Sequence, residues 1–165
     1  MNNKTVIIIG SSRKAGNTAK IAMHIAQEHN WEVINLSDYK ISYYDYESKN
    51  LGDDFLPLIR RIIQNYDTLI FATPVYWYNV SGILKVFFDR FSDLIRIEKD
   101  LGRQLRGKNI GMISNNHSDN IEDTFYIPLQ KSADYLGMNY IGHQHFNADN
   151  QTINELELTQ QIENI

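Results

Sequence analysis

Short apolar runs rich in β-branched residues alternate with segments of helical periodicity along this 165-residue chain. The run at residues 6–9 reads VIII, which is typical of a central parallel strand covered on both faces. Four further strands are predicted, at residues 31–36, 68–72, 108–114 and 140–146. The alternation constrains the fold more than any other feature, because parallel strands require helical crossovers between them.

The segments between the predicted strands have the spacing of amphipathic helices. Helices are predicted at residues 17–27, 53–66, 81–91 and 122–136, the last of them with Gly137 as its C-cap. A final helix is predicted in the tail, where Thr152 and Glu155 have the spacing of a capping box. The least regular segment is the long loop at residues 39–52, after the second strand.

Five strand–helix repeats predict an α/β fold with a doubly wound, five-stranded parallel sheet between two helical layers. Right-handed crossovers leave few topologies, and this length suits the strand order 2-1-3-4-5. No composition break, internal repeat or linker divides the sequence, so residues 1–165 are expected to form a single domain.

The composition excludes several classes of site. The chain has no cysteine, so disulfides, a cysteine nucleophile, thiolate-bound zinc and a cysteine-ligated iron–sulfur cluster are all excluded. No metal site is predicted. The formal net charge of −4 argues against general nucleic-acid binding, which usually needs a basic face.

The opening sequence MNNKTVIIIG contains one short apolar run, too short for a signal-peptide core or a membrane span. We therefore expect a cytoplasmic protein without a membrane partner.

Ligands of an open parallel sheet bind outside the carboxyl ends of the strands, where the winding direction reverses. For the predicted order this place lies between the first and third strands. The first loop there reads GSSRKAGNT, residues 10–18, and leads into a helix. Helix N-termini favour anions, and the serine, threonine and asparagine side chains add hydrogen-bond donors for a phosphate. The alternative is a simple turn before a capped helix, with Arg13 and Lys14 solvated.

Two further loops lie at the same edge of the predicted sheet. The second, residues 73–81, carries the consecutive aromatics Tyr76, Trp77 and Tyr78. Three adjacent rings suit contact with a flat conjugated ligand, although they could instead cover the sheet edge or an interface. The third, residues 114–121, reads SNNHSDNI and offers many hydrogen-bonding groups. Its His117 is interpreted either as a surface residue or as a group that takes part directly.

The first two loops resemble the signatures of NAD(P)H-dependent FMN reductases. GSSRKAGNT is similar to their phosphate loop, whose usual form is close to G-S-P-R-K-x-G-N-T. TPVYWYNVSGILKVFFDRF resembles their P-x-Y pattern and the following helix with L-K-x-F-x-D-R. Both occur in the expected order, and the similarity extends from about residue 4 to residue 142.

The resemblance implies a flavodoxin-like fold, one FMN, and NADPH or NADH as the electron donor. The phosphate would lie on the first loop, and the isoalloxazine ring would lie between the second and third loops. Asp89 and Arg90 match the family's D-R pair and are interpreted as structural residues, either within the fold or in subunit packing. The cofactor-binding residues predicted in this way are Ser11, Ser12, Arg13, Gly16, Asn17, Thr18, Pro74, Val75, Tyr76, Trp77, Tyr78, Asn79, Ser114, Asn115, Asn116 and His117.

The sequence departs from the family pattern in three places. Many relatives carry cysteines after the second strand, where this chain reads ISYYDYES, so the cluster-bearing branch is excluded. Ser81 stands where proline is frequent, and the third loop lacks the glycine pair of many members.

The expected function is transfer of a hydride from a reduced nicotinamide, through flavin N5, to a small-molecule electron acceptor: a quinone, free flavin, azo or nitro compound. No protein nucleophile is required, since the cofactor carries the chemistry. The alternatives are a flavodoxin-type electron carrier and a flavin-free binding module on the same fold. A homodimer is expected, with Phe87, Phe88 and residues 43–46 as candidate contacts.

Overall fold

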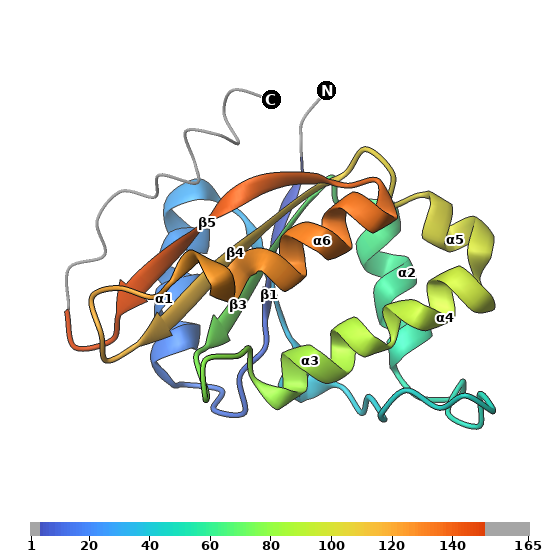
Figure 1. Ribbon diagram of the computed structural model, residues 1–165, viewed down its shortest axis with the longest axis horizontal. Coiled ribbons are helices and arrows are strands. Elements are labelled where there is room, and N and C mark those ends of the chain that lie inside the picture. The colour runs from blue at the N-terminus through green and yellow to red at the C-terminus, as the bar shows by residue number, and fades with distance from the viewer. Residues whose placement is uncertain (1–3, 151–165) are drawn as a thin grey trace.

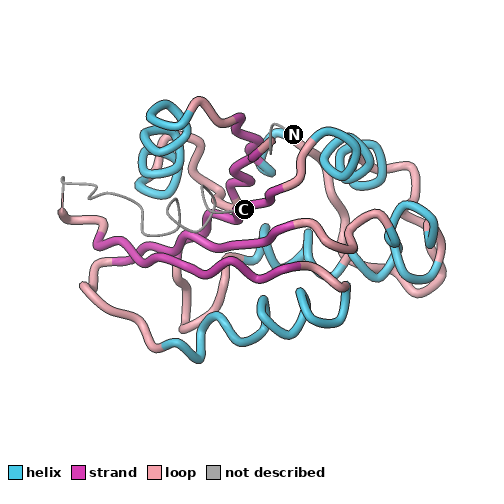
Figure 2. Tube along the Cα trace, turned by 90° about the horizontal axis from the view of Figure 1, so that it is seen from above, coloured by secondary structure: helices cyan, strands magenta, loops and turns pink. Residues whose placement is uncertain are grey.

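The computed structural model describes residues 4–150, which form a five-stranded parallel sheet with helices on both sides (Figures 1 and 2). The strand order is β2-β1-β3-β4-β5, as predicted. The strands are β1 (Thr5–Ile9), β2 (Glu32–Asn35), β3 (Thr68–Pro74), β4 (Asn109–Asn116) and β5 (Asn139–Asn147). The predicted flavodoxin-like architecture is therefore confirmed. The helix expected in the tail lies outside the described residues.

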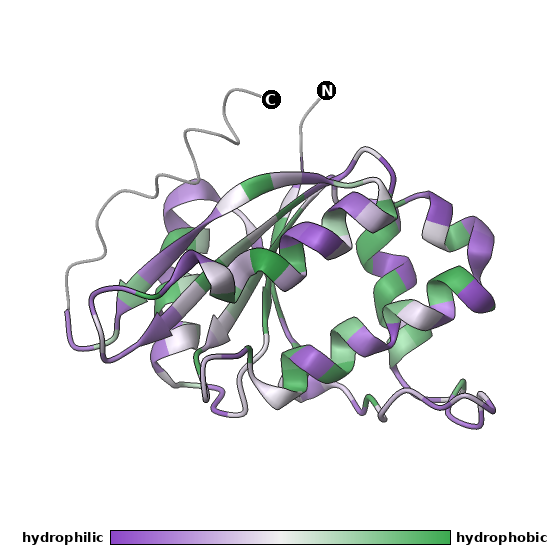
Figure 3. Cartoon of the chain, in the orientation of Figure 1, coloured by the Kyte–Doolittle hydropathy of each residue, from purple (hydrophilic) through white to green (hydrophobic). Residues whose placement is uncertain are grey.

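The connections are helical. The α-helices are α1 (Asn17–His29), α2 (Phe55–Asn65), α3 (Gly82–Asp89), α4 (Phe91–Arg96), α5 (Lys99–Arg103) and α6 (Ile127–Leu136); two 3₁₀ turns, η1 (Leu36–Asp38) and η2 (Asp123–Tyr126), complete the described elements. The hydropathy colours of Figure 3 alternate along α2, α3 and α4, as expected of amphipathic helices. None of the described helices is both long enough and apolar enough to cross a membrane.

Two stretches differ from the predicted helices. The single helix expected at residues 122–136 is divided into η2 and α6. Pro128 lies in the first turn of α6, where a missing N–H breaks no helical hydrogen bond, so a new helix begins there. Helices α4 and α5 were not predicted, because helices of six and five residues are too short to show a clear period.

The sheet buries apolar side chains on both faces. Val6 and Ile8 belong to the cluster beneath α2, α3 and α6, whereas Ile7 and Ile9 pack with the buried side chains of α1. This follows from the two-residue period of a strand. Phe87, which we considered for a subunit contact, is fully buried in the first cluster and is unavailable to a partner.

Arg90 fixes the long loop after β2 to the helical layer. Its guanidinium is fully buried, pairs with Asp53 and Asp93, and donates through Nη1 to the carbonyl oxygen of Ser42 at 3.1 Å. It also lies over the ring of Phe55, 4.8 Å from the centroid. A buried cation is stable only when such partners surround it. The structural interpretation of the D-R pair fits Arg90, whereas Asp89 forms a surface ion pair with Lys85.

The same contacts act on the Asp53 carboxyl. Burial by itself would raise its pKa, but the hydrogen bond from Arg90 and those from the backbone N–H groups of Ser42 and Phe55 outweigh it and lower the pKa. Asp53 therefore remains ionised and paired with Arg90 at neutral pH.

Candidate functional site

The first loop ends at a helix N-terminus that the chain itself leaves uncapped. Gly16 is the N-cap of α1, makes no side-chain cap hydrogen bond, and is followed by no acidic residue in the first turn. The first N–H groups of a helix have no partner within the helix and attract an anion. Ser11 is buried and accepts a hydrogen bond from the N–H of Arg13 at 3.3 Å, whereas Arg13 and Asn17 are exposed. This arrangement fits a phosphate group.

Gly10 allows the first and second loops to meet. A Cβ at Gly10 would lie 2.5 Å from Cβ of Leu84 in α3, so only glycine permits this close approach. Ser81 strengthens the contact, because its hydroxyl donates to the carbonyl oxygen of Gly10 at 2.5 Å and accepts from the N–H of Leu84 at 3.2 Å. Ser81, one of the departures from the family pattern, thus caps α3 and joins it to the end of β1.

Asn115 joins the third loop to the other two. The buried Thr18 hydroxyl donates to Oδ1 of Asn115 at 2.7 Å, and the backbone N–H of Val75 donates to the Asn115 carbonyl oxygen at 2.9 Å. Pro74 pairs with Asn115 in the ladder between β3 and β4. The carboxyl ends of β1, β3 and β4 therefore bring all three predicted loops together.

The second loop is a tight turn that exposes its aromatic rings. Tyr76 and Asn79 exchange backbone hydrogen bonds of 2.9 and 3.0 Å across it. Trp77 and Tyr78 have φ values of 51° and 58°, the left-handed pair of a type I′ turn that asparagine and glycine usually form. Their side chains are 95% and 87% exposed. Unfavourable backbone conformations of this kind concentrate at ligand sites.

A pocket of about 630 Å³ lies between this turn and the third loop. Its size is within the range of small-molecule and cofactor sites. The predicted residues in its wall are Val75, Trp77, Tyr78 and Asn116, and the residues missed by sequence reasoning are Ser118, Asn120, Ile121, Glu122, Thr124 and Phe125. The first three of the missed residues fall in the third loop that we singled out. The last three had been assigned to a helix, whereas in the structure Glu122 precedes η2, and Thr124 and Phe125 lie in η2.

The predicted residues of the third loop differ in burial. Ser114 and Asn115 are buried and Asn116 is half-buried in β4, whereas His117 is exposed. Nδ1 of His117 lies 2.9 Å from a carboxylate oxygen of Asp149, and His117 does not line the pocket. Its geometry fits the surface interpretation of this residue.

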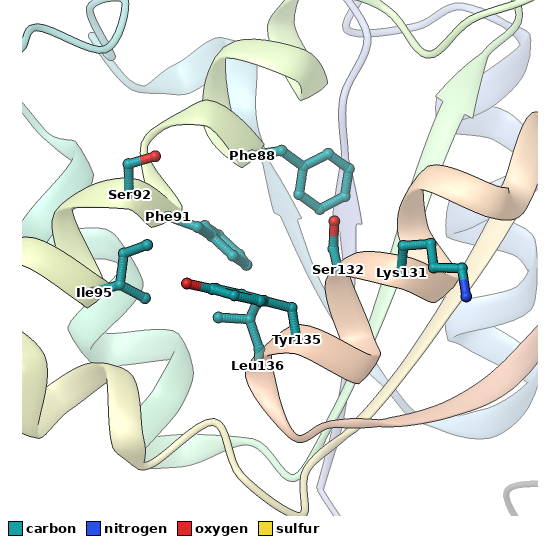
Figure 4. A pocket seen from close by; sticks show the side chains of 8 residues that line it. All are labelled: Phe88, Phe91, Ser92, Ile95, Lys131, Ser132, Tyr135 and Leu136. Atoms are coloured by element: carbon teal, nitrogen blue, oxygen red, sulfur yellow. The ribbon is translucent and has the colours of Figure 1, made fainter.

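Two of the other cavities lie at the first loop and against α6. One of about 590 Å³ is lined by Ser12 of the first loop and by residues that include Tyr39 and Tyr43. The other, shown in Figure 4, is an apolar hollow of about 300 Å³ between α3–α4 and α6, where the rings of Phe91 and Tyr135 lie near each other. None of the predicted cofactor residues lines the hollow of Figure 4.

Residues 3–152 match the family of NADPH-dependent FMN reductases. The chain belongs to this family. The resemblance seen in the first two loops is therefore confirmed, and the predicted cofactor and electron donor are those of the family.

Individual relatives agree with this assignment. YwqN of Bacillus subtilis, whose name describes an NAD(P)H-dependent FMN-containing oxidoreductase, is 38% identical over 99 residues, 56% of this chain and 54% of YwqN. An NADPH azoreductase of a Bacillus species is 28% identical over 96 residues, 58% of this chain and 54% of its own. The matches thus span about half the length of these relatives. The solved structure of the Trp repressor binding protein of Bacillus subtilis superimposes with a TM-score of 0.68 and 27% identity, over 86% of this chain and 83% of its own.

Replacement of Gly10 by alanine tests the contact that joins the loops. The new methyl group would meet Leu84 Cβ at 2.5 Å and Cα at 3.2 Å, so α3 must shift. We expect unfolding in urea to show a loss of about 1–3 kcal/mol, the usual effect of overpacking.

The matched control is Gly82→Ala at the start of α3. A Cβ there meets nothing within 4 Å, and we expect stability equal to or above that of the original chain, since alanine favours a helix by about 1 kcal/mol over glycine. Equal stability of the two variants would contradict the close-approach argument.

Proposed function

We propose that this protein is an FMN-dependent oxidoreductase that oxidises NADPH or NADH and reduces a small-molecule acceptor. The observation that carries the proposal is the 630 Å³ pocket at the carboxyl edge of the sheet, between the exposed aromatic turn after β3 and the polar loop after β4. The uncapped start of α1 is joined to the end of β4, which leads into that loop, by the Thr18–Asn115 hydrogen bond. A flat ring with an anionic tail suits this combination of surfaces.

The first loop would hold the FMN phosphate. Backbone N–H groups at the start of α1 and the side chains of Ser11, Ser12, Arg13 and Asn17 supply donors and positive charge around Gly16. Thr18 has a different role, because its hydroxyl donates a hydrogen bond to Asn115 and so holds the first and third loops together.

The second and third loops would hold the isoalloxazine ring. Pro74 and Val75 lead into the aromatic turn, in which Asn79 also donates from its backbone to Tyr76, and Asn116 faces the pocket from the opposite wall. The left-handed conformations of Trp77 and Tyr78 fix the direction in which their rings project. Polar groups of the third loop would orient the ring edge by hydrogen bonds.

Bound FMN supplies hydride acceptance from the nicotinamide at N5 and release of the electrons to the acceptor. The chain's own residues bind and orient, and the exposed aromatic turn leaves room for a nicotinamide and an acceptor to use the same face in turn. Quinones, free flavins, azo compounds and nitro compounds are the acceptor classes that we propose; similarity to an NADPH azoreductase favours azo compounds. We further propose that the protein acts in the cytoplasm.

Absorbance spectra of the purified protein test the function directly. We expect a yellow protein, or one that becomes yellow with FMN, whose colour is bleached rapidly by NADPH or NADH and restored by an acceptor. A protein that stays colourless after FMN addition would overturn the proposal. Bleaching only with an added reductase would identify an electron carrier instead.

The double variant Arg13→Ala with Thr18→Ala tests the phosphate site. Loss of the cation and of the hydroxyl that orders the loop is expected to weaken FMN binding at least tenfold, about 1.4 kcal/mol, in a fluorescence titration. Lys99→Ala in α5 removes one exposed charge far from the loop and should bind FMN normally. Unchanged affinity of the double variant would place the phosphate elsewhere.

We also propose a homodimer, because large aromatic side chains are exposed on two loops. Tyr43 and Tyr46 after β2 and Trp77 and Tyr78 after β3 are each more than three quarters exposed, and exposed apolar side chains of this size suit an interface. Light scattering at micromolar concentration is expected to give twice the 19.2 kDa chain mass. Replacement of Tyr43 and Tyr46 by serine should shift the mass toward that of one chain, and a monomeric mass for the original protein would refute the dimer.

A further inference from the structure

A chain of hydrogen bonds runs from β5 to the wall of the pocket. Nε2 of His145 lies 3.1 Å from Oδ1 of Asn116 and 3.2 Å from the carbonyl oxygen of Ser118. Nδ1 of the same ring lies 2.8 Å from Oγ of Ser114, which in turn lies 2.6 Å from the hydroxyl oxygen of Tyr126. The parallel register that pairs Ser114 with His145 places the ring there. Asn116 and Ser118 both line the pocket.

The partners determine the direction of every hydrogen bond in this chain. The Ser118 carbonyl oxygen can only accept, and Oδ1 of Asn116 already accepts from the N–H of Ser118 at 2.7 Å. Nε2 of His145 therefore carries the hydrogen. A neutral ring then accepts at Nδ1 from the Ser114 hydroxyl, and Ser114 accepts from the hydroxyl of Tyr126. Every group in the chain has a partner in this one arrangement.

We propose that neutral His145 is a positioning residue, which holds the third loop in the conformation that forms the ring pocket. The inference rests on the proposed function of that pocket as the flavin site. Through Nε2, His145 binds the loop at a side chain and at a backbone oxygen, and so fixes both ends of the turn from Asn116 to Ser118. Sequence reasoning missed this residue because it lies about thirty positions from the loop that it holds.

Protonation of the ring would disrupt the chain. A charged imidazole donates from both nitrogens, so Oγ of Ser114 accepts from His145 and the Ser114 hydroxyl can no longer donate to Nδ1. The hydroxyls of Ser114 and Tyr126, which are 0% and 1% exposed, then have one hydrogen more than this chain has acceptors for. An unpaired buried hydroxyl is unfavourable, so the closed loop favours the neutral ring.

The surroundings of His145 agree with a neutral ring. Burial lowers its pKa, more than the Ser118 carbonyl raises it. From β5 and η2, His143 stacks on Tyr126 and lies near Asp123, and burial lowers the pKa of His143 as well.

The remaining charged groups come from the third loop and the segment after β5. Asp149 pairs with His117, and Asp119 accepts from Asn147. Within residues 4–150, no carboxylate forms an ion pair with His145 that would stabilise its charged form.

Two substitutions distinguish the hydrogen bonds that the two ring nitrogens of His145 make. His145→Gln places an amide N–H near the position of Nε2 and keeps the bond to the loop. The shorter side chain of His145→Asn reaches only to the position of Nδ1, so it keeps the hydrogen bond to Ser114 and loses the one to the third loop. In FMN titrations at pH 7.5 we expect His145→Asn to bind at least tenfold more weakly and His145→Gln to bind within threefold of the original protein.

The pH dependence of FMN affinity is a second test, because a residue with a merely structural role would not change it. An ordinary histidine has a pKa of about 6.5, and the closed loop requires the neutral ring, so FMN affinity should fall as the pH is lowered from 7.5 to 5.5. Glutamine and asparagine do not titrate, so in both variants the fall of FMN affinity that is due to residue 145 should disappear. Titration of the FMN phosphate is common to all three proteins and cancels in the comparison.

Measurements on the FMN-free protein keep the inference separate from the proposed function. Nitrogen NMR of the imidazole should show hydrogen on Nε2 at pH 7.5, and amide exchange at Ser118 should be faster in His145→Asn than in His145→Gln. If the original protein binds no FMN, the proposed function fails while these two measurements still test the loop. Hydrogen on Nδ1, or equal Ser118 exchange in both variants, would overturn the positioning role even if a variant folds poorly.

Discussion

The close approach of Gly10 to Leu84 is the contact on which the rest of the site depends. It allows the start of α3 to lie directly against the end of β1, with no side chain between them. Ser81 then joins the two segments through the Gly10 carbonyl oxygen and caps α3 with the same hydroxyl. Because Gly10 begins the loop after β1 and Ser81 ends the loop after β3, this contact joins the two loops.

Asn115 extends the same arrangement to β4. Its side chain accepts from Thr18 and its backbone carbonyl accepts from Val75, so one residue contacts both of the other loops. Buried hydrogen bonds of this kind are specific, because a loop that moves away leaves a polar group without a partner. The pocket is therefore bounded by segments whose relative positions are fixed by the sheet, rather than by three independent loops.

The unfavourable features of the molecule are concentrated at this edge. Trp77 and Tyr78 adopt left-handed backbone conformations, their rings face solvent, and the start of α1 has no side-chain cap. Elsewhere the chain follows ordinary rules, with buried apolar strands and a buried cation, Arg90, that is paired with two carboxylates. A stable sheet with local violations at one edge is the expected form of a binding site built on a rigid scaffold.

The strands, the sheet order and the three loops could all be predicted from the sequence, since periodicity and turn residues are local signals. GSSRKAGNT and the aromatic triplet could also be predicted from it as candidate segments of the site. Which side chains meet could be seen only in the folded chain: Thr18 with Asn115, 97 positions apart, Arg90 with Asp53, and His145 with Asn116. The fold also divides one predicted helix between Tyr126 and Ile127, and Phe125 in the first of the two pieces lines the pocket. Such contacts depend on strand register and helix packing, which the whole chain sets together and no local pattern encodes.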